Sequence, residues 1–124
     1  AELGLAYRSS NEVAKAKDYY QDSAEIYHRI GDSADEAFQL RNVALALSDM
    51  HKPTEALEAA LQAKSLADTS KSWFSQYWSR RALAQLYGIQ GGYEDSVTCL
   101  REARDISELA NQPLNSAWAA LELS

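Results

Sequence analysis

The sequence has few of the features typical of secreted, membrane-bound or disulfide-stabilised proteins. Its single cysteine, Cys99, cannot form a disulfide within the chain, and the apolar helical register around it predicts a buried, reduced thiol. No apolar run approaches the roughly 18 residues of a membrane-spanning helix, and the first residues lack the basic and apolar regions of a signal peptide. We therefore expect no membrane segment and a cytoplasmic location.

Basic residues are scarce as well. Lys and Arg together number 12 against 18 Asp and Glu, which gives a formal charge of -6 and an isoelectric point near 4.8. Affinity for phosphate backbones comes chiefly from clustered Lys and Arg. We therefore expect no nucleic-acid binding by this chain.

The usual motifs of catalysis and metal binding are missing from the sequence. His28 and His51 fall in different helical registers, and neither shares a short metal-ligand spacing with Cys99. There is no glycine-rich phosphate loop and no nucleophile elbow. We expect a segment that is not an enzyme and that needs no cofactor or metal.

Glycine and proline, which commonly mark linkers, are few. Both prolines, Pro53 and Pro113, stand at expected helix starts, and no low-complexity run separates one part of the chain from another. A length of 124 residues also suits one domain. We therefore expect a single domain over residues 1–124.

What the sequence does contain is a pattern that returns every 40 residues. Residues 40–57 are echoed by residues 80–97, and residues 3–16 supply a third copy. The agreeing registers are Leu3/Val43/Leu83, Gly4/Ala44/Ala84, Tyr7/Leu47/Tyr87 and Ala16/Ala56/Ser96. Self-similarity at this period predicts an array of helical hairpins. The small residues in the second and fourth registers predict that neighbouring helices approach to about 8–10 Å.

Turn and capping residues predict where the helices begin and end. Ser33 with Glu36 forms the pattern of a capping box. Asn11, His51 and Gly91 occupy equivalent positions at which the backbone is expected to turn to positive φ. The expected helices cover residues 11–30, 33–49, 53–68, 73–90 and 93–109, with a loop over 68–72. The apolar stripe expected for the first of these is Val13, Ala16, Tyr20, Ser23, Ile26, Tyr27 and Ile30.

The two ends of the chain interrupt the repeats. The boundaries give a partial repeat 1 (1–31), repeat 2 (32–71), repeat 3 (72–111) and the first helix of a truncated repeat 4 (112–124). We expect the chain to be a piece of a longer protein. Ala117, Trp118 and Leu121 would then form an apolar strip without its covering hairpin, and self-association through this end is expected.

These residues resemble the tetratricopeptide repeat family. The resemblance is carried by Leu-Gly-Leu-Ala-Tyr at 3–7, Leu83-Ala84 with Tyr87, Gly91 with Tyr93, and then Ser96, Leu100 and Ala103. Family repeats usually have about 34 residues, and this 40-residue variety is similar to that of kinesin light chains and bacterial signalling regulators. The middle repeat departs from the family pattern at Leu47, His51 and Pro53. The resemblance implies an all-α, right-handed α-solenoid of antiparallel helix pairs, whose first helices line a concave groove.

The resemblance also implies a peptide-binding groove. Phe38, Trp78 and Trp118 recur at one register, and Arg41 and Arg81 follow the first two by three residues. The expected groove residues are Phe38, Arg41, Asn42, Leu45, Trp78, Arg81, Gln85 and Trp118. Aromatic rings and guanidinium groups provide much of the binding energy of protein interfaces. The alternative is that the aromatic rings fill the seams between helix pairs and that the arginines are solvated.

The groove residues limit the classes of partner that we expect. Asn42 stands where chaperone-binding members of the family carry one Asn of a carboxylate clamp. Leu5, Trp78 and Ala82 occupy the neighbouring clamp positions, so a chaperone tail is not expected. We predict a regulatory or sensory module of a larger, bacterial signalling protein that binds a peptide, a protein or its own output domain. The alternative is a free-standing adaptor that recruits a partner protein through the groove. An output domain adjoining the chain would favour the module, and free termini the adaptor.

Overall fold

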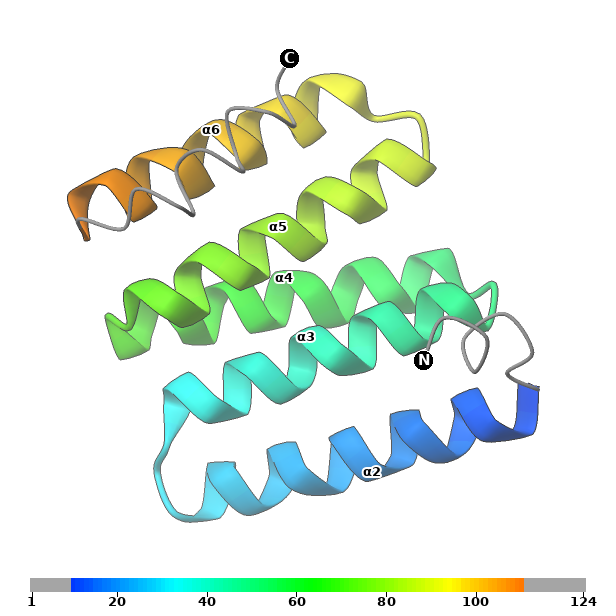
Figure 1. Cartoon of the computed structure of the whole chain (residues 1–124). Helices are drawn as coiled ribbons and strands as arrows, with labels where there is room; N and C mark the ends of the chain where they lie inside the picture. The colour runs from blue at the N-terminus through cyan, green and yellow to red at the C-terminus, as the bar shows by residue number, and fades with distance from the viewer. Residues whose placement is uncertain (1–9, 111–124) are drawn as a thin grey trace.

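The computed structural model describes residues 10–110, and this part of the chain is built from helices joined by short turns. The helices are α2 (Ser10–Arg29), α3 (Ser33–Asp49), α4 (Pro53–Ser70), α5 (Trp73–Ile89) and α6 (Tyr93–Leu109) (Figure 1). The predicted all-α class is confirmed for residues 10–110. None of these helices has the length and apolar character needed to cross a membrane. The predictions for residues 3–7 and for the helix containing Trp118 lie outside the described residues.

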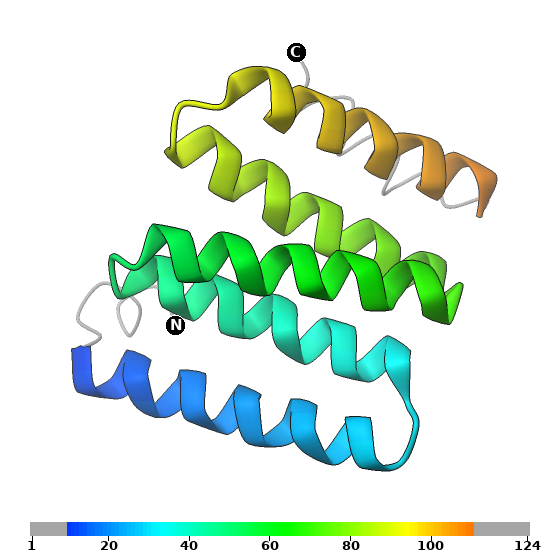
Figure 2. The ribbon, with the colours of Figure 1, turned by 180° about the vertical axis from the view of Figure 1, so that it is seen from behind.

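The helices pack in chain order. Each contacts the helix before it and the helix after it, and α3 and α5 also contact each other. Figure 1 shows α2 at one end of the stack and α6 at the other, and Figure 2 shows α4 lying over α3 when the molecule is seen from behind. The two helices with the most neighbours, α3 and α5, therefore run through the middle of the described part.

The positions of the helices repeat as the sequence does. Ser33 and Trp73 begin α3 and α5, and Pro53 and Tyr93 begin α4 and α6, so each helix of one pair starts 40 residues before its counterpart. Equivalent residues are also buried together, as in the pairs Val43/Leu83, Ala44/Ala84, Ala60/Leu100 and Ala63/Ala103. Val43, Leu83 and Leu100 join the small residues in one hydrophobic core, to which α3, α4, α5 and α6 all contribute.

Ala44 provides a test of how tightly this core is packed. Its side chain is completely buried, so Ala44→Leu adds volume where no space is open. We expect the free energy of unfolding to fall by about 1–3 kcal/mol, measured by urea denaturation followed by circular dichroism. The control is Gln62→Leu, because Gln62 is exposed on α4 and a leucine there meets solvent. Equal stability of the two variants would contradict the close packing.

Three turns share one geometry. Gly31, His51 and Gly91 have φ of 77°, 61° and 83°. In each turn the next amide donates to a carbonyl of the preceding helix: Asp32 to Tyr27 at 2.9 Å, Lys52 to Leu47 at 3.0 Å and Gly92 to Tyr87 at 2.7 Å. This is the Schellman pattern of helix ends. Positive φ was predicted correctly for His51 and Gly91 but wrongly for Asn11, which lies in the first turn of α2.

The turn at His51 uses a residue poorly suited to its backbone angle. A left-handed conformation costs a side chain with a Cβ about 1–2 kcal/mol relative to the right-handed one, whereas glycine adopts it freely. A glycine at position 51 would remove this cost, but part of the stability gained would be lost because glycine raises the entropy of the unfolded chain. We expect His51→Gly to raise the free energy of unfolding by about 0.5–1 kcal/mol, and His51→Ala to give no gain. A destabilised glycine variant in urea denaturation would contradict this assignment.

The predicted cap of α3 was displaced by one residue. The helix begins at Ser33, and the capping group is the carboxylate of Asp32, which accepts a hydrogen bond from the amide of Asp35 at 3.0 Å. This bond lowers the pKa of Asp32. Glu36, the expected partner of Ser33, instead contacts Nδ1 of His28 at 3.2 Å and so joins α3 to α2. Asp32 and Ser33 are both good capping residues, and the prediction of Ser33 from the sequence pattern was wrong.

The loop predicted over residues 68–72 is also wrong in extent. The helix α4 continues to Ser70, and Lys71 ends it with φ of 61°. The hydroxyl of Thr69 donates to the carbonyl of Ser65 at 3.1 Å, and that of Ser70 donates to Ala67 at 2.7 Å. Because these side chains bond to the preceding turn, a polar run can extend the helix.

The apolar stripe predicted for α2 is buried in part. Within the stripe Val13 is buried, but Ile26 and Ile30 are exposed, contrary to the prediction. Ala24, which the stripe did not include, is also buried. Among the described helices α2 contacts α3 alone. Periodicity identifies an apolar face, but it does not show how much of that face a neighbouring helix covers.

Candidate functional site

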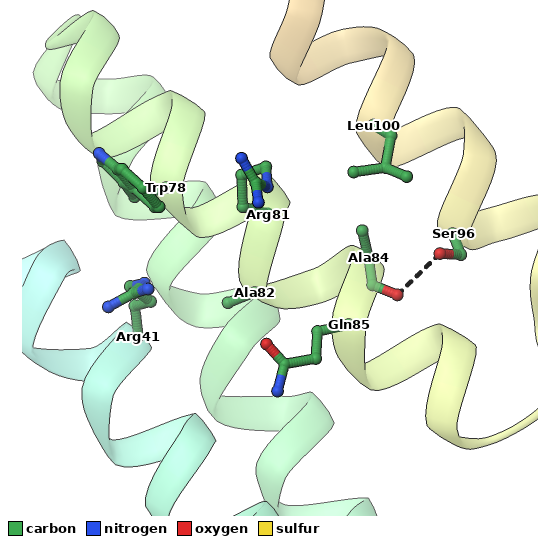
Figure 3. Close-up of a pocket in the computed structure, with 8 residues that line it drawn as sticks. All are labelled: Arg41, Trp78, Arg81, Ala82, Ala84, Gln85, Ser96 and Leu100. Atoms are coloured by element: carbon green, nitrogen blue, oxygen red, sulfur yellow. Dashed lines mark hydrogen bonds between the residues drawn. The ribbon is translucent and has the colours of Figure 1, made fainter. Parts of the chain in front are cut away.

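A hollow of about 390 Å³ lies against α3, α5 and α6 (Figure 3). Its lining consists of Arg41 from α3, Trp78, Arg81, Ala82, Ala84 and Gln85 from α5, and Ser96 and Leu100 from α6. Four of the eight predicted groove residues are in this set: Arg41, Trp78, Arg81 and Gln85. The hollow therefore brings together side chains from three helices.

Two arginines share the ring of Trp78. The guanidinium carbon of Arg41 lies 5.4 Å from the centre of the Trp78 ring and 5.2 Å from that of Phe38. The guanidinium carbon of Arg81 lies 5.6 Å from Trp78 and 5.6 Å from Tyr77. These distances are typical of cation–π contacts, each worth about 0.5–2 kcal/mol according to exposure. Phe38 and Trp78 therefore lie on the same side of the helix array.

The spacing along α5 explains how this cluster forms. Residues three and four apart lie on one face of a helix, which places Phe74, Tyr77, Trp78 and Arg81 together. The ring of Tyr77 meets that of Trp78 edge to face, with centres 5.1 Å apart, and it is completely buried. Nη1 of Arg81 donates to the Tyr77 hydroxyl at 2.7 Å. Through this hydrogen bond, the buried Tyr77 connects Arg81 to the core.

The aromatic rings also serve packing. Phe38 of α3 and Phe74 of α5 lie 5.7 Å apart between ring centres, so this pair joins the two helices as the alternative interpretation expects. Arg41, however, is half-buried rather than solvated. Phe38 therefore contributes to the seam, while Arg41 and Trp78 also line the hollow.

Arg41 is in an electrostatically unfavourable place. Burial lowers its pKa, and the positive charge of Arg81 lowers it further. Nη1 donates to the side-chain oxygen of Asn42 at 2.9 Å, but no carboxylate within residues 10–110 pairs with Arg41. Nε of Arg41 and Nε1 of Trp78 are buried without an acceptor in this part of the chain. Within residues 10–110, the charge of this guanidinium group is therefore not neutralised by a carboxylate.

Of the remaining predicted groove residues, Asn42 and Leu45 do not line the hollow. Asn42 holds the Arg41 guanidinium, and Leu45 is half-buried. Gln85 lines the hollow with an exposed side chain. Trp118 lies outside the described residues.

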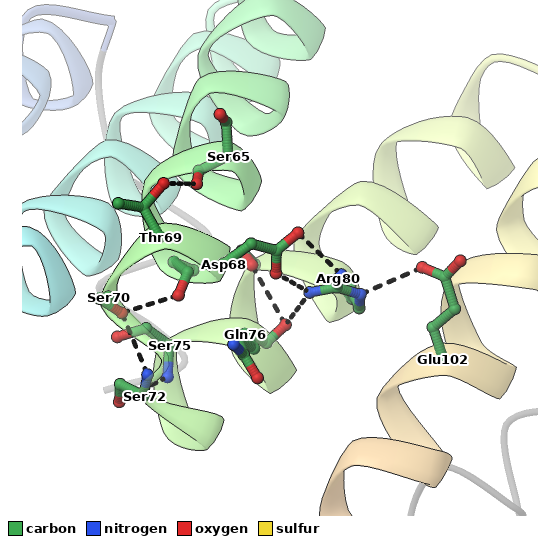
Figure 4. Close-up of polar contacts among 11 residues, drawn as sticks. Ser65, Asp68, Thr69, Ser70, Ser72, Ser75, Gln76, Arg80 and Glu102 are labelled. Atoms are coloured by element: carbon green, nitrogen blue, oxygen red, sulfur yellow. Dashed lines mark hydrogen bonds and ion pairs between the residues drawn. The ribbon is translucent and has the colours of Figure 1, made fainter.

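Arg80 was not singled out in the sequence, although it makes the most extensive polar contacts of the described part (Figure 4). Nη1 and Nη2 donate to the carboxylate of Asp68 at 2.9 and 3.1 Å, and Nε donates to Glu102 at 3.0 Å. This buried residue of α5 therefore connects α4 and α6. A signal was present, because Arg80 stands 40 residues after Leu40, an apolar residue at the equivalent position of α3.

The cysteine and metal-ligand side chains add no reactive centre to the described part. Cys99 is buried in the core, as predicted, and burial raises the pKa of its thiol. Within residues 10–110 there is no group of three or more His, Cys, Asp or Glu side chains placed to hold a metal ion.

Residues 10–110 are thus consecutively packed α-helices with a hollow lined by two arginines and a tryptophan. Comparison with known proteins does not narrow this all-α class. No protein-family model matches the chain, and neither a curated protein nor a solved structure shows significant similarity to it.

Proposed function

We propose that the chain is a tetratricopeptide-like scaffold that binds a peptide or protein segment in the hollow beside α3 and α5. In this proposal the helix pairs continue as a right-handed α-solenoid, and the array is a regulatory or sensory module of a larger signalling protein. The 40-residue interval between equivalent helix starts supports the repeat architecture. A free-standing adaptor would use the same hollow, with a partner that is a separate chain.

The observation that carries this proposal is the cluster of Arg41, Trp78 and Arg81 on one hollow. Trp and Arg are the residues most enriched at the energetic centres of protein interfaces, because each buries a large area and retains directional contacts. Packing alone would account for Phe38 against Phe74. It does not account for a half-buried Arg41 without a carboxylate partner among the described residues.

A selection for linear peptides tests the proposal. The whole chain is panned against a display library of random decapeptides, and the affinity of enriched peptides is measured by fluorescence anisotropy. We expect the double variant Arg41→Ala/Arg81→Ala to bind them about tenfold or more weakly, since truncating a charged interface contact is costly. The control is Arg29→Ala/Arg101→Ala, which removes the same charge from exposed positions.

Two results would contradict the proposed function. One is the absence of any enriched peptide. The other is equal loss of affinity in the two double variants, which would indicate general charge attraction rather than the hollow. If peptides bind and the parent's own output domain competes with them, the module is favoured over the adaptor.

A further inference from the structure

We infer that the hollow recognises an acidic side chain of its peptide, with the carboxylate bound at Arg41 beside the ring of Trp78. This inference rests on the proposed function and adds the chemical class of the ligand. It follows from the different surroundings of Arg80, which is buried, and Arg41, which is half-buried.

Arg80 shows how this protein neutralises an arginine in its interior. Burial alone would lower the pKa of Arg80, but hydrogen bonds and charge attraction from Asp68 and Glu102 outweigh burial and raise it. Arg41, on the neighbouring helix of the same core, receives no such carboxylate within residues 10–110, and the nearby charge is the positive one of Arg81. A carboxylate supplied by a ligand would neutralise the charge of Arg41 as the carboxylate of Asp68 neutralises that of Arg80.

The donors of Arg41 point to the same chemistry. A guanidinium has five N–H donors and no acceptor, and one hydrogen bond, to Asn42, is made by Arg41 within the described part. The buried Nε of Arg41 and the buried indole N–H of Trp78 lack acceptors there, so the surrounding packing does not satisfy the pair internally. A cation would be repelled at this place, and a purely apolar group would leave the donors and the charge as they are.

The surroundings favour a peptide carboxylate over a phosphate. The hollow is lined on its other sides by Ala82, Ala84 and Leu100, which suit the apolar parts of an extended peptide. The lining that residues 10–110 provide contains no lysine, and phosphate sites commonly combine several cations with helix N-termini. The overall charge of -6 also means that an acidic peptide would be attracted locally and not by the protein as a whole.

Nuclear magnetic resonance provides a direct test. The labelled chain is titrated with N-acetyl-glutamate N-methylamide, with its neutral counterpart N-acetyl-glutamine N-methylamide, and with inorganic phosphate, while the Arg41 Nε–H and Trp78 indole signals are followed. We expect saturable shifts with the glutamate compound alone. Arg41→Gln should abolish them, Arg41→Lys should retain weaker shifts at the indole, and Arg101→Gln should change nothing.

A second measurement separates this inference from the proposed function. Replacing each Asp or Glu of an enriched decapeptide by Asn or Gln should weaken binding about tenfold or more at one position, and this loss should vanish in Arg41→Gln. Peptides that bind without an acidic residue would overturn the inference and leave the proposed function standing. Glutamate shifts without any peptide binder would remove the proposed function and retain the carboxylate site. Equal shifts with the glutamine compound, stronger shifts with phosphate, or no shifts would each overturn the carboxylate assignment.

Discussion

Replacing Tyr77 by alanine is expected to lower the free energy of unfolding by about 3–5 kcal/mol, the usual cost of removing a large buried aromatic ring. The side chain of Tyr77 has no exposed surface, so the substitution leaves a cavity that surrounding helices fill only in part. Its ring also supports that of Trp78 from a centre distance of 5.1 Å. The substitution therefore removes a contact of the core and a support of the hollow at once.

The matched control for Tyr77 is another tyrosine. Tyr93, at the start of α6, is 70% exposed, and Tyr93→Ala should change stability by about 0.5 kcal/mol or less. Guanidinium chloride denaturation followed by circular dichroism compares the two variants. If both lose the same small amount, Tyr77 does not have the buried position described.

Tyr77→Phe separates the ring from the hydroxyl. The ring stays, and the acceptor that Nη1 of Arg81 reaches at 2.7 Å is lost, so the stability should fall by about 0.5–1.5 kcal/mol. Arg81 then loses this hydrogen bond to the core. In the proposed function this variant should bind selected peptides more weakly while remaining fully folded.

The repeat explains why most of the helices could be predicted. Apolar and small residues at positions such as Val43/Leu83 and Ala60/Leu100 are buried in both copies, so one helix pair predicts the position of the next. The errors occur where local alternatives have similar energies. Asp32 and Ser33 can both cap a helix, and the hydroxyls of Thr69 and Ser70 bond to their own helix. A sequence pattern does not show which of these alternatives has the lower free energy.

The candidate site was predicted only as far as its register. The recurrence of Phe38 and Trp78, with arginines three residues later, showed that these residues share a register, and Arg41 contacts both rings in the structure. The support from Tyr77 was missed because an aromatic residue on an apolar face looks like any other core residue. The partners of Arg80 were missed because Asp68 and Glu102 are 12 and 22 residues away along the chain, and the sequence does not show which distant carboxylate will face it.

Arg80→Ala is expected to lower the free energy of unfolding by about 2–4 kcal/mol. Hydrogen bonds to charged groups are each worth about 1.5–3 kcal/mol, and breaking a buried ion pair can cost about 3–5 kcal/mol. The cost here lies below the sum because the side chains of Asp68 and Glu102 are 42% and 44% exposed, so water can solvate them once the arginine is gone. The buried stem of Arg80 adds lost packing between α4, α5 and α6.

Two further variants show whether the loss comes from the connection between three helices. Arg80→Lys retains a positive charge but has no planar fork that can reach Asp68 with two nitrogens and Glu102 with a third, so it should recover less than half of the loss. Arg101→Ala removes an exposed arginine from α6 and should change stability by about 0.5 kcal/mol or less. Urea denaturation gives all three values. If Arg80→Lys were as stable as the wild type, a single positive charge would suffice, and the three-helix connection would not hold α4 and α6 to α5. If Arg80→Ala were as stable as Arg101→Ala, the ion pairs would contribute nothing to the stability of the fold.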